Sequence, residues 1–347
     1  MARTDQRQFC RNKGVGQYQL RRLPLSRKPL LRWDQARTLH ERDRGQRCRV
    51  PAGIQPTLHV RKLIACLSAL WGATGLRAQS LEIRFLDVGQ GDAILLRSEG
   101  KVALVDAGRS PDVIYLLDSL GVDTIDLLLV SHNHADHIGG VPAVLSTFPV
   151  RFYLDNGVPA SIYAYQEALD LVERLGITYL RPTARIITLG KATLRILPLS
   201  LEGDPTDQNN SSVGVLVQCD SFKALLTGDS EVAELSAWLE MESLPKVDVF
   251  KAGHHGSGNG MTPDWLEHIR PDVVVISVGA WNAYGQPDPW ALAQYRRVGA
   301  DVYRTDQDGE VDILVCSDGS YFVRTELESA ESVESCRSDS PIQERSR

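Results

Sequence analysis

Two shortages in the sequence exclude whole classes of protein. The 347 residues include six cysteines. Those after residue 79 are Cys219, Cys316 and Cys336, an odd number without paired CxxC spacing, so the sequence predicts neither a cysteine-based zinc site nor a disulfide framework. Long apolar runs are also missing, because the stretch 63–76 is shorter than the about 20 residues that a transmembrane helix needs. A membrane channel within this chain is therefore not expected.

Acidic residues are scarce in the first part of the chain, and basic residues are the minority in the rest. Residues 1–79 contain 17 Lys and Arg against four Asp and Glu, a net charge of +13. The later residues contain 21 Lys and Arg against 40 Asp and Glu, a net charge of −19. A folded domain usually mixes both signs, so the two parts are expected to have different origins or fates.

The first 78 residues contain two segments that are not expected to join the folded domain. Residues 1–59 show no sustained apolar periodicity, so we expect them to be disordered or upstream of the true translation start; a basic nucleic-acid-binding arm is the alternative. Residues 60–78 have the layout of a signal peptide, with Arg61-Lys62, the apolar run and Ala78 before the cut. We expect an exported protein, periplasmic or extracellular, or one anchored to the membrane by an uncleaved 60–78 segment.

From residue 81 onward short apolar strands alternate with helices. Several helices carry start or stop signals, such as Thr262-Pro263 before one of them and Gly121 after another. The pattern predicts one mixed α and β domain over residues 79–326. Residues 327–347 are rich in Ser, Glu and Arg, which is typical of a disordered tail.

Four potential metal ligands follow the predicted strand 125–130 directly. They are His132, His134, Asp136 and His137. Imidazole and carboxylate groups bind divalent cations, and three of the chain's eight histidines in this spacing are far from random composition. Because the four side chains cannot all reach one ion, we predict one cation at the first pair and a second at the last pair.

This run resembles the HxHxDH motif of the metallo-β-lactamase superfamily. The resemblance continues in Gly228-Asp229 and in His254-His255, each after an apolar strand. It implies that Asp229 bridges two metals, that His254 is the last ligand, and that His255 is a proton donor or phosphate contact. It also implies the α/β fold of that superfamily, a four-layer αββα sandwich of two mixed β-sheets flanked by helices.

A narrower resemblance is to the hydrolase domain of the competence protein ComEC. It rests on residues 87–93, 132–137, 226–229 and 254–257, and with weaker motifs it covers most of 81–315. Two positions differ, because His134 stands where ComEC domains often have an acidic residue and Gln286 where they usually have His. The superfamily's middle histidine ligand is missing, and Asn210 in that region is either a contact to water or substrate or a turn former.

The remaining candidates belong to these motifs or to strand ends that should face the site. The aspartates among them could orient ligating histidines or only cap turns. They are Asp87, Gln90, Asp92, Asp106, Lys251 and Ser257.

The ligand set predicts a hydrolase in which two divalent ions, Zn²⁺ or Mn²⁺, activate water while Asp136 helps to orient the nucleophile. A phosphodiesterase or nuclease is the first hypothesis, with DNA or a cell-wall component as the substrate. The net charge of −19 opposes DNA, because polyanion binding relies on clustered Lys and Arg. The alternatives are a lactonase or β-lactamase-type acyl hydrolase and a non-catalytic, metal-stabilised binding module.

Overall fold

The computed structural model describes residues 78–199, 204, 206–241 and 244–327. All of them belong to one of two compact units of the chain, Trp71–Arg347. The predictions for residues 1–59, for the signal peptide at 60–78 apart from Ala78, and for the tail at 327–347 apart from Leu327 lie outside the described residues.

Eight strands form the first sheet, in the order β15-β14-β1-β2-β3-β4-β5-β6. Strand β1 shows why they pair in this way, because Leu81, Ile83 and Phe85 are fully buried on one face. On the other face Arg84 pairs with Glu82 at 3.0 Å. The strands from β3 to β6 run parallel and the others antiparallel. Their bounds are β1 Gln79–Phe85, β2 Ile94–Ser98, β3 Lys101–Val105, β4 Ile125–Leu129, β5 Val150–Leu154, β6 Thr178–Leu180, β14 Val311–Cys316 and β15 Tyr321–Thr325.

Seven strands form the second sheet, in the order β13-β12-β11-β10-β9-β8-β7. The strands from β10 to β13 run parallel, while β7 to β10 are antiparallel neighbours. Their bounds are β7 Arg185–Leu189, β8 Ala192–Ile196, β9 Val215–Cys219, β10 Phe222–Leu226, β11 Val249–Lys251, β12 Val273–Ile276 and β13 Asp301–Arg304. Apolar side chains of both sheets share one core between them.

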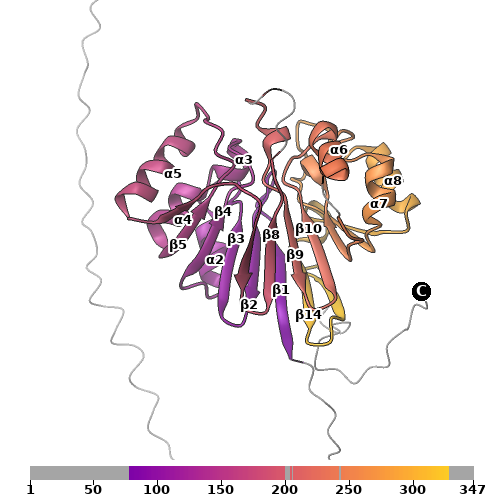
Figure 1. The fold of residues 1–347 in the computed structure, drawn as a ribbon, viewed down its shortest axis with the longest axis horizontal. Helices are drawn as coiled ribbons and strands as arrows, with labels where there is room; N and C mark the ends of the chain where they lie inside the picture. The colour runs from indigo at the N-terminus through magenta and orange to yellow at the C-terminus, as the bar shows by residue number, and fades with distance from the viewer. Residues whose placement is uncertain (1–77, 200–203, 205, 242–243, 328–347) are drawn as a thin grey trace, which may run out of the picture. The chain divides into compact units, whose positions relative to one another are not determined.

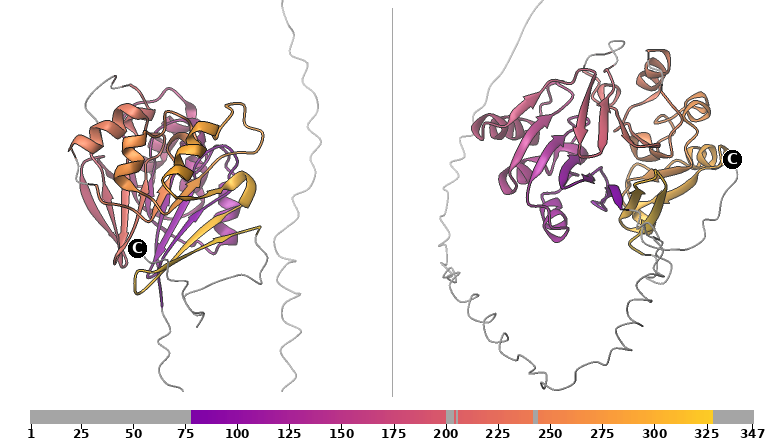
Figure 2. Two further views of the ribbon diagram at one scale, coloured as in Figure 1. Left: turned by 90° about the vertical axis from the view of Figure 1, so that its right-hand side faces the viewer. Right: turned by 60° about the horizontal axis from the view of Figure 1, so that its bottom comes forward.

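Helices cover the outer faces of the two sheets, as Figure 1 and the turned view in Figure 2 show. On the first sheet lie α2 Val113–Ser119, α4 Val141–Thr147 and α5 Tyr163–Arg174, and on the second lie α6 Val232–Met241, α7 Pro263–Ile269 and α8 Pro289–Arg297. The cap predicted for α7 is present, because Thr262 Oγ1 accepts from Trp265 N at 3.0 Å. The predicted four-layer αββα sandwich is confirmed.

Two further observations concern the cysteines and the helices of the described residues. Cys219 is buried with a free thiol. Within the part of the chain that the structure describes, no helix combines the length and the apolar character needed to cross a membrane.

Candidate metal centre

The candidate ligands follow strands of both sheets. His132 lies three residues after the end of β4, in the first sheet, and Asp229 lies three residues after the end of β10, in the second. His255 belongs to η3 Gly253–Gly256, just after β11. A backbone hydrogen bond from Val213 N to Ser131 O, at 2.8 Å, joins the loop after β4 to the segment that precedes β9 of the second sheet. The centre therefore depends on the packing of one sheet against the other.

The carboxylate of Asp229 is the meeting point of this cluster. Its Oδ2 lies 3.2 Å from Nε2 of His137, 3.5 Å from Nε2 of His255 and 3.8 Å from Nε2 of His132. These four side chains are at most 3% exposed. Ligand atoms of His132, His137 and Asp229 all lie within 4.8 Å of one another, which is close enough to share a cation.

A second group of donors overlaps the first. Ligand atoms of Asp136, His137 and His255 also lie within 4.8 Å of one another. Asp136 comes from the short helix α3 Ala135–Ile138, and its Oδ2 is 3.6 Å from Nε2 of His255. The two groups share His137, so the structure offers neighbouring positions for cations.

Each buried imidazole is oriented through its Nδ1 atom. Nδ1 of His137 lies 2.9 Å from Asp106 Oδ2, and Nδ1 of His255 lies 2.8 Å from Ser277 O. These acceptors favour a proton on Nδ1 and leave Nε2 free to bind metal. The three aspartates of the sequence prediction have different roles, because Asp106 orients a histidine, Asp87 Oδ1 only accepts from Gly89 N in a turn, and Asp92 contacts Lys251.

Several atoms that face this centre are buried without a hydrogen-bond partner. They include Nε2 of His137, Nε2 of His255 and Oδ1 of Asp229. A buried polar atom without a partner is costly, and a divalent cation would satisfy nitrogen and carboxylate donors together. The residues present therefore fit a divalent metal centre.

The imidazole and carboxylate groups of the cluster shift one another's pKa values. Burial lowers the pKa of His132 well below its usual value, and neighbouring His137 lowers it further. Burial also acts to lower the pKa of His137, but the Asp229 and Asp106 carboxylates outweigh it and raise that pKa well above the usual value. Burial acts to raise the pKa of Asp229, yet His137 and His255 hold it well below the usual range. Without metal, protonated imidazoles thus neutralise the carboxylates.

A buried lysine supports the same carboxylates. Lys251 is fully buried at the end of β11, contacts Asp92 Oδ2, and donates to Gly228 O at 3.0 Å. Its Nζ is 3.8 Å from Asp229 Oδ1. Burial acts to lower the pKa of Lys251, but Asp92 and Asp229 raise it, so the ammonium stays charged. The ion pair between Lys251 and Asp92 therefore joins the end of β11, in the second sheet, to the segment between β1 and β2 of the first sheet.

The other predicted residues lie at different distances from this cluster. His134 is exposed, and its Nδ1 is 3.1 Å from Nε2 of His132. The Asn210 side chain contacts its own loop and helix α6, because it donates to Asp207 Oδ2 at 2.8 Å and accepts from Glu234 N at 3.2 Å. This geometry favours the interpretation of Asn210 as a turn former.

Two more predicted residues lie in loops beside the ligands. Gln90 links loops, since its Nε2 donates to Gln286 Oε1 at 2.8 Å and its Oε1 accepts from Gly279 N at 3.1 Å. Ser257 is half-buried directly after η3, and its backbone N donates to His254 O at 2.9 Å.

The geometry favours His255, rather than the expected His254, as the metal ligand of this pair. His255 is buried and belongs to the second donor group. His254 is a quarter exposed, its Nε2 is 3.9 Å from Asp229 Oδ2, and its Nδ1 lies 3.0 Å from Glu231 Oε1. Both histidines have left-handed backbones, with φ of 47° and 54°, and this turn buries the second ring in the cluster while the first ring lies at its edge beside Glu231.

Known proteins are similar to this chain over the segment that carries the candidate metal centre. The sequence profile of the "Metallo-beta-lactamase superfamily" matches residues 86–280. The chain belongs to the metallo-β-lactamase superfamily. ComE operon protein 3 of Bacillus subtilis is 27% identical over 254 residues, which are 66% of this chain and 32% of that protein. Recombination protein 2 of Haemophilus influenzae is 28% identical over 245 residues, which are 67% of this chain and 28% of that protein.

A third relative shares a shorter segment. Endoribonuclease ysh-1 of Neurospora crassa is 26% identical over 130 residues, 34% of this chain and 15% of that protein. The chain spans about a third, or less, of the length of these relatives. The predicted resemblance to the superfamily and to the competence proteins is confirmed, and membership supports a metal-dependent hydrolase.

Sequence reasoning missed some residues around the metallo-β-lactamase centre. Arg109 Nη2 lies 4.0 Å from Asp136 Oδ2, with a half-exposed side chain, and Glu231 faces His254. Ser277 contributes only a carbonyl oxygen, which no sequence pattern reveals. The position of Arg109 shortly after the predicted strand 101–106 was an available signal, since strand ends face the site in this superfamily.

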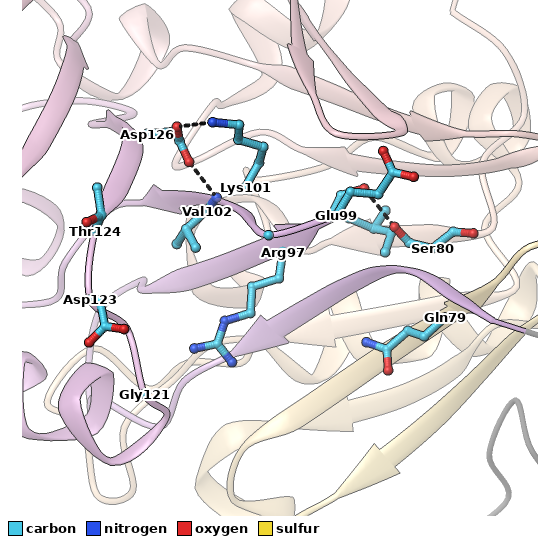
Figure 3. A pocket seen from close by; sticks show the side chains of 13 residues that line it. Gln79, Ser80, Arg97, Glu99, Lys101, Val102, Gly121, Asp123, Thr124 and Asp126 are labelled. Atoms are coloured by element: carbon cyan, nitrogen blue, oxygen red, sulfur yellow. Dashed lines mark hydrogen bonds and ion pairs between the residues drawn. The ribbon is translucent and has the colours of Figure 1, made fainter.

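A cavity of about 710 Å³ lies elsewhere in the fold, beside the β2–β3 turn (Figure 3). Its lining includes Arg97, Lys101 and Asp126, and Lys101 Nζ pairs with Asp126 Oδ1 at 2.9 Å. Asp126 belongs to the start of β4, whereas the metal ligands follow the end of that strand. The orphaned donor atoms of the metal centre, rather than the size of this cavity, identify the site of chemistry.

Proposed function

We propose that the chain is a phosphodiesterase, in the sense that includes nucleases, with two divalent ions, Zn²⁺ or Mn²⁺. The observation that carries the proposal is Asp229 Oδ2, which lies within 3.8 Å of three imidazole Nε2 atoms. One carboxylate among so many nitrogen donors is suited to bridge two ions. In this assignment His132 and His134 would hold one ion, and Asp136, His137 and His255 would hold the other.

When bound, two such ions polarise a phosphoryl oxygen and make a water molecule nucleophilic at neutral pH. The chain itself positions the reactants. Burial acts to raise the pKa of Asp136, but His255 and His137 hold it below the usual range, so its ionised carboxylate accepts a hydrogen bond from the attacking water. Arg109, at the edge of the site, offers a cation to an anionic substrate.

A phosphate ester is favoured over an acyl substrate by two observations. The exposed guanidinium of Arg109 next to Asp136 suits a negatively charged substrate. One relative over the matched segment is named an endoribonuclease, and another is named a recombination protein. The net charge of −19 after residue 79 favours a short phosphodiester, from nucleic acid or the cell wall, over a long polyanion.

The test is hydrolysis of bis(p-nitrophenyl) phosphate by the full chain with added Zn²⁺ or Mn²⁺, beside the variant His132→Ala. We expect metal-dependent turnover that the variant lacks. A chromogenic lactone is assayed in parallel. Turnover of the lactone alone would replace the proposal with acyl hydrolysis, and bound metal without turnover of either substrate would replace it with a binding module.

We also propose that the protein is exported. The charge layout of residues 60–78 supports this. Gln79, which follows the predicted cut, begins β1. N-terminal sequencing of protein from the periplasm or medium should start at Gln79, and recovery only from the cytoplasm with the segment intact would refute export.

A further inference from the structure

Three exposed aromatic rings lie in the segment that joins β12 to α8 and in the first turn of α8. The side chains are Trp281, at 101% exposure, Tyr284 at 64% and Trp290 at 47%, and we call them the aromatic rim. Trp238 and Trp265, by contrast, are fully buried in the core. Large aromatic groups gathered in water are a common mark of a binding surface.

The base of the aromatic rim is attached to the metal centre. Gln286 Nε2 donates to His254 O at 3.1 Å, and Gln286 Oε1 accepts from Gln90 Nε2 at 2.8 Å. Gly279 N donates to Gln90 Oε1 at 3.1 Å. These bonds bracket Trp281 and Tyr284 on both sides in sequence. The rings therefore project from a loop that borders the ligands.

Trp290, on α8, lies beside the loop that carries His255. Its Cε3 lies 3.8 Å from the position that a Cβ on Gly258 would take. Gly258 lies three residues after His255 in the sequence. The first turn of α8 thus packs beside the loop that carries His255.

The loop holds its shape through one asparagine. Asn282 Nδ2 donates to Gly279 O at 3.0 Å and to Gln286 O at 2.6 Å, while its Oδ1 accepts from Tyr284 N and from Gln286 N, both at 3.1 Å. Trp281 has φ of 58°, a left-handed backbone that is costly for a tryptophan. Such strain is kept only where the surroundings fix it, and it concentrates at functional sites.

We propose that the aromatic rim is a subsite for a nucleobase carried by the phosphodiester substrate, with Trp281 as the stacking residue. This rests on the proposed function. Stacking suits a chain with a net charge of −19 after residue 79, because it needs the face of a ring rather than a row of cations. A nucleobase next to the scissile phosphate would lie over the rim while the phosphate lies at the metal centre.

The test compares two substrates that share a leaving group. Thymidine 5′-(p-nitrophenyl) phosphate carries a base, and methyl p-nitrophenyl phosphate does not. We expect Trp281→Ala to raise KM for the nucleoside ester about tenfold with kcat nearly unchanged, since one stacked base contributes roughly that factor. KM for the methyl ester should not move, and Trp281→Phe should restore most of the loss. Tyr115→Ala, on α2, is the matched control, because Tyr115 is also exposed, at 68%.

A binding measurement separates this inference from the proposed function. Thymidine 5′-monophosphate is titrated into the full chain without metal, and tryptophan fluorescence is recorded. We expect saturable quenching in the wild type and in Tyr115→Ala, but not in Trp281→Ala. If neither ester is hydrolysed and quenching depends on Trp281, the function fails and the subsite stands. Equal KM values for the nucleoside ester, or quenching that is absent or unaffected by Trp281→Ala, would overturn the subsite.

Discussion

At Asp229 the charge of one carboxylate, more than its shape, should decide metal binding. The side chain is almost fully buried. The neighbouring His137 and His255 stabilise its ionised form and so lower its pKa. Asp229→Asn keeps the shape and removes the charge. We expect metal-dependent turnover to fall by about a hundredfold or more, because replacing even an outer partner of a ligand costs about 10- to 100-fold. Metal content per chain, measured after gel filtration, should fall with it.

The matched control for this variant is Asp220→Asn, in the turn between β9 and β10. Asp220 has φ of 52°, a backbone that asparagine tolerates well, so this change should alter neither metal content nor turnover. Full metal content in Asp229→Asn would show that Asp229 is not a bridging ligand.

The neighbouring histidines His254 and His255 allow a second comparison. Because His255 Nε2 is buried and close to Asp136, His255→Ala should reduce bound metal from two ions to one. His254→Ala should keep both ions, since its ring is a quarter exposed and faces Glu231. Metal content by mass spectrometry decides between them. Loss of metal in His254→Ala alone would restore the order that the family resemblance implied.

Metal binding should release protons. Although burial acts to lower the pKa values of His137 and His255, neighbouring carboxylates raise both above the usual value of 6.5, so without metal both rings keep a proton to higher pH than a free imidazole does. Ligation requires the neutral ring, so apparent metal affinity should increase with pH. For the metal-free fold the sign is opposite, because a raised histidine pKa stabilises it below pH 6.5 and this contribution is lost as pH rises through the folded-state pKa.

Calorimetry of the metal titration at pH 7 in two buffers with different ionisation enthalpies measures this proton release. The observed heats should differ by an amount that corresponds to at least one proton per chain. Identical heats in both buffers would contradict protonated ligands in the metal-free protein.

At the scale of elements, the turn between β1 and β2 shows how backbone space shapes the site. Gly91 has φ of 139°, and a Cβ there would lie 2.2 Å from Asp136 O. Gly91→Ala should therefore push the Asp136 loop away, destabilise the fold by more than the about 1–2 kcal/mol of an unfavourable backbone, and reduce turnover. Gly89→Ala has a similar backbone requirement, with φ of 74°, but no atom within 4 Å of its Cβ. Urea unfolding of both variants should rank Gly91→Ala as less stable, and equal stabilities would refute the steric argument.

The sequence allowed most elements to be predicted because their apolar periodicity is long enough to recognise. The helix predicted at 162–175 is α5, and the strand predicted at 125–130 contains β4. The strand β6 and the helices α3 and α9 were not predicted; each of the two helices is a single turn of four residues, which is too short for a helical periodicity to be recognised. Their formation depends on packing against neighbours.

The candidate site was predictable as a set of ligands and less so as a geometry. The residue types and spacing of the run from His132 to His137 are enough to predict metal binding. Which of His254 and His255 turns inward depends on two consecutive left-handed backbones, which no preference of histidine indicates. The contacts of Ser277 and Gln286 involve residues 22 and 32 positions away, so local patterns could not reveal them.

At the scale of the whole domain, the metal centre should act as a link between the two sheets. His132 and His137 follow β4 of the first sheet, whereas Asp229 and His255 follow β10 and β11 of the second. Without cations their contact depends on the coupled imidazole and carboxylate charges described above. A ligand that binds only the folded state at about 1,000 times its Kd stabilises that state by about 4 kcal/mol.

Removal of metal should therefore lower the thermal stability of the entire sandwich, not only its activity. For a domain of this size a change of 1 kcal/mol shifts Tm by roughly 2–4 °C, so chelation by EDTA should lower Tm by about 10 °C. Asp229→Asn should have the lower Tm already and should not respond to EDTA, whereas Asp220→Asn should respond like the wild type. Calorimetric scans of the three proteins test this. If EDTA abolishes turnover and leaves Tm unchanged in the wild type, the cations serve catalysis without joining the sheets, and the packing of the shared apolar core alone holds the ligands in place.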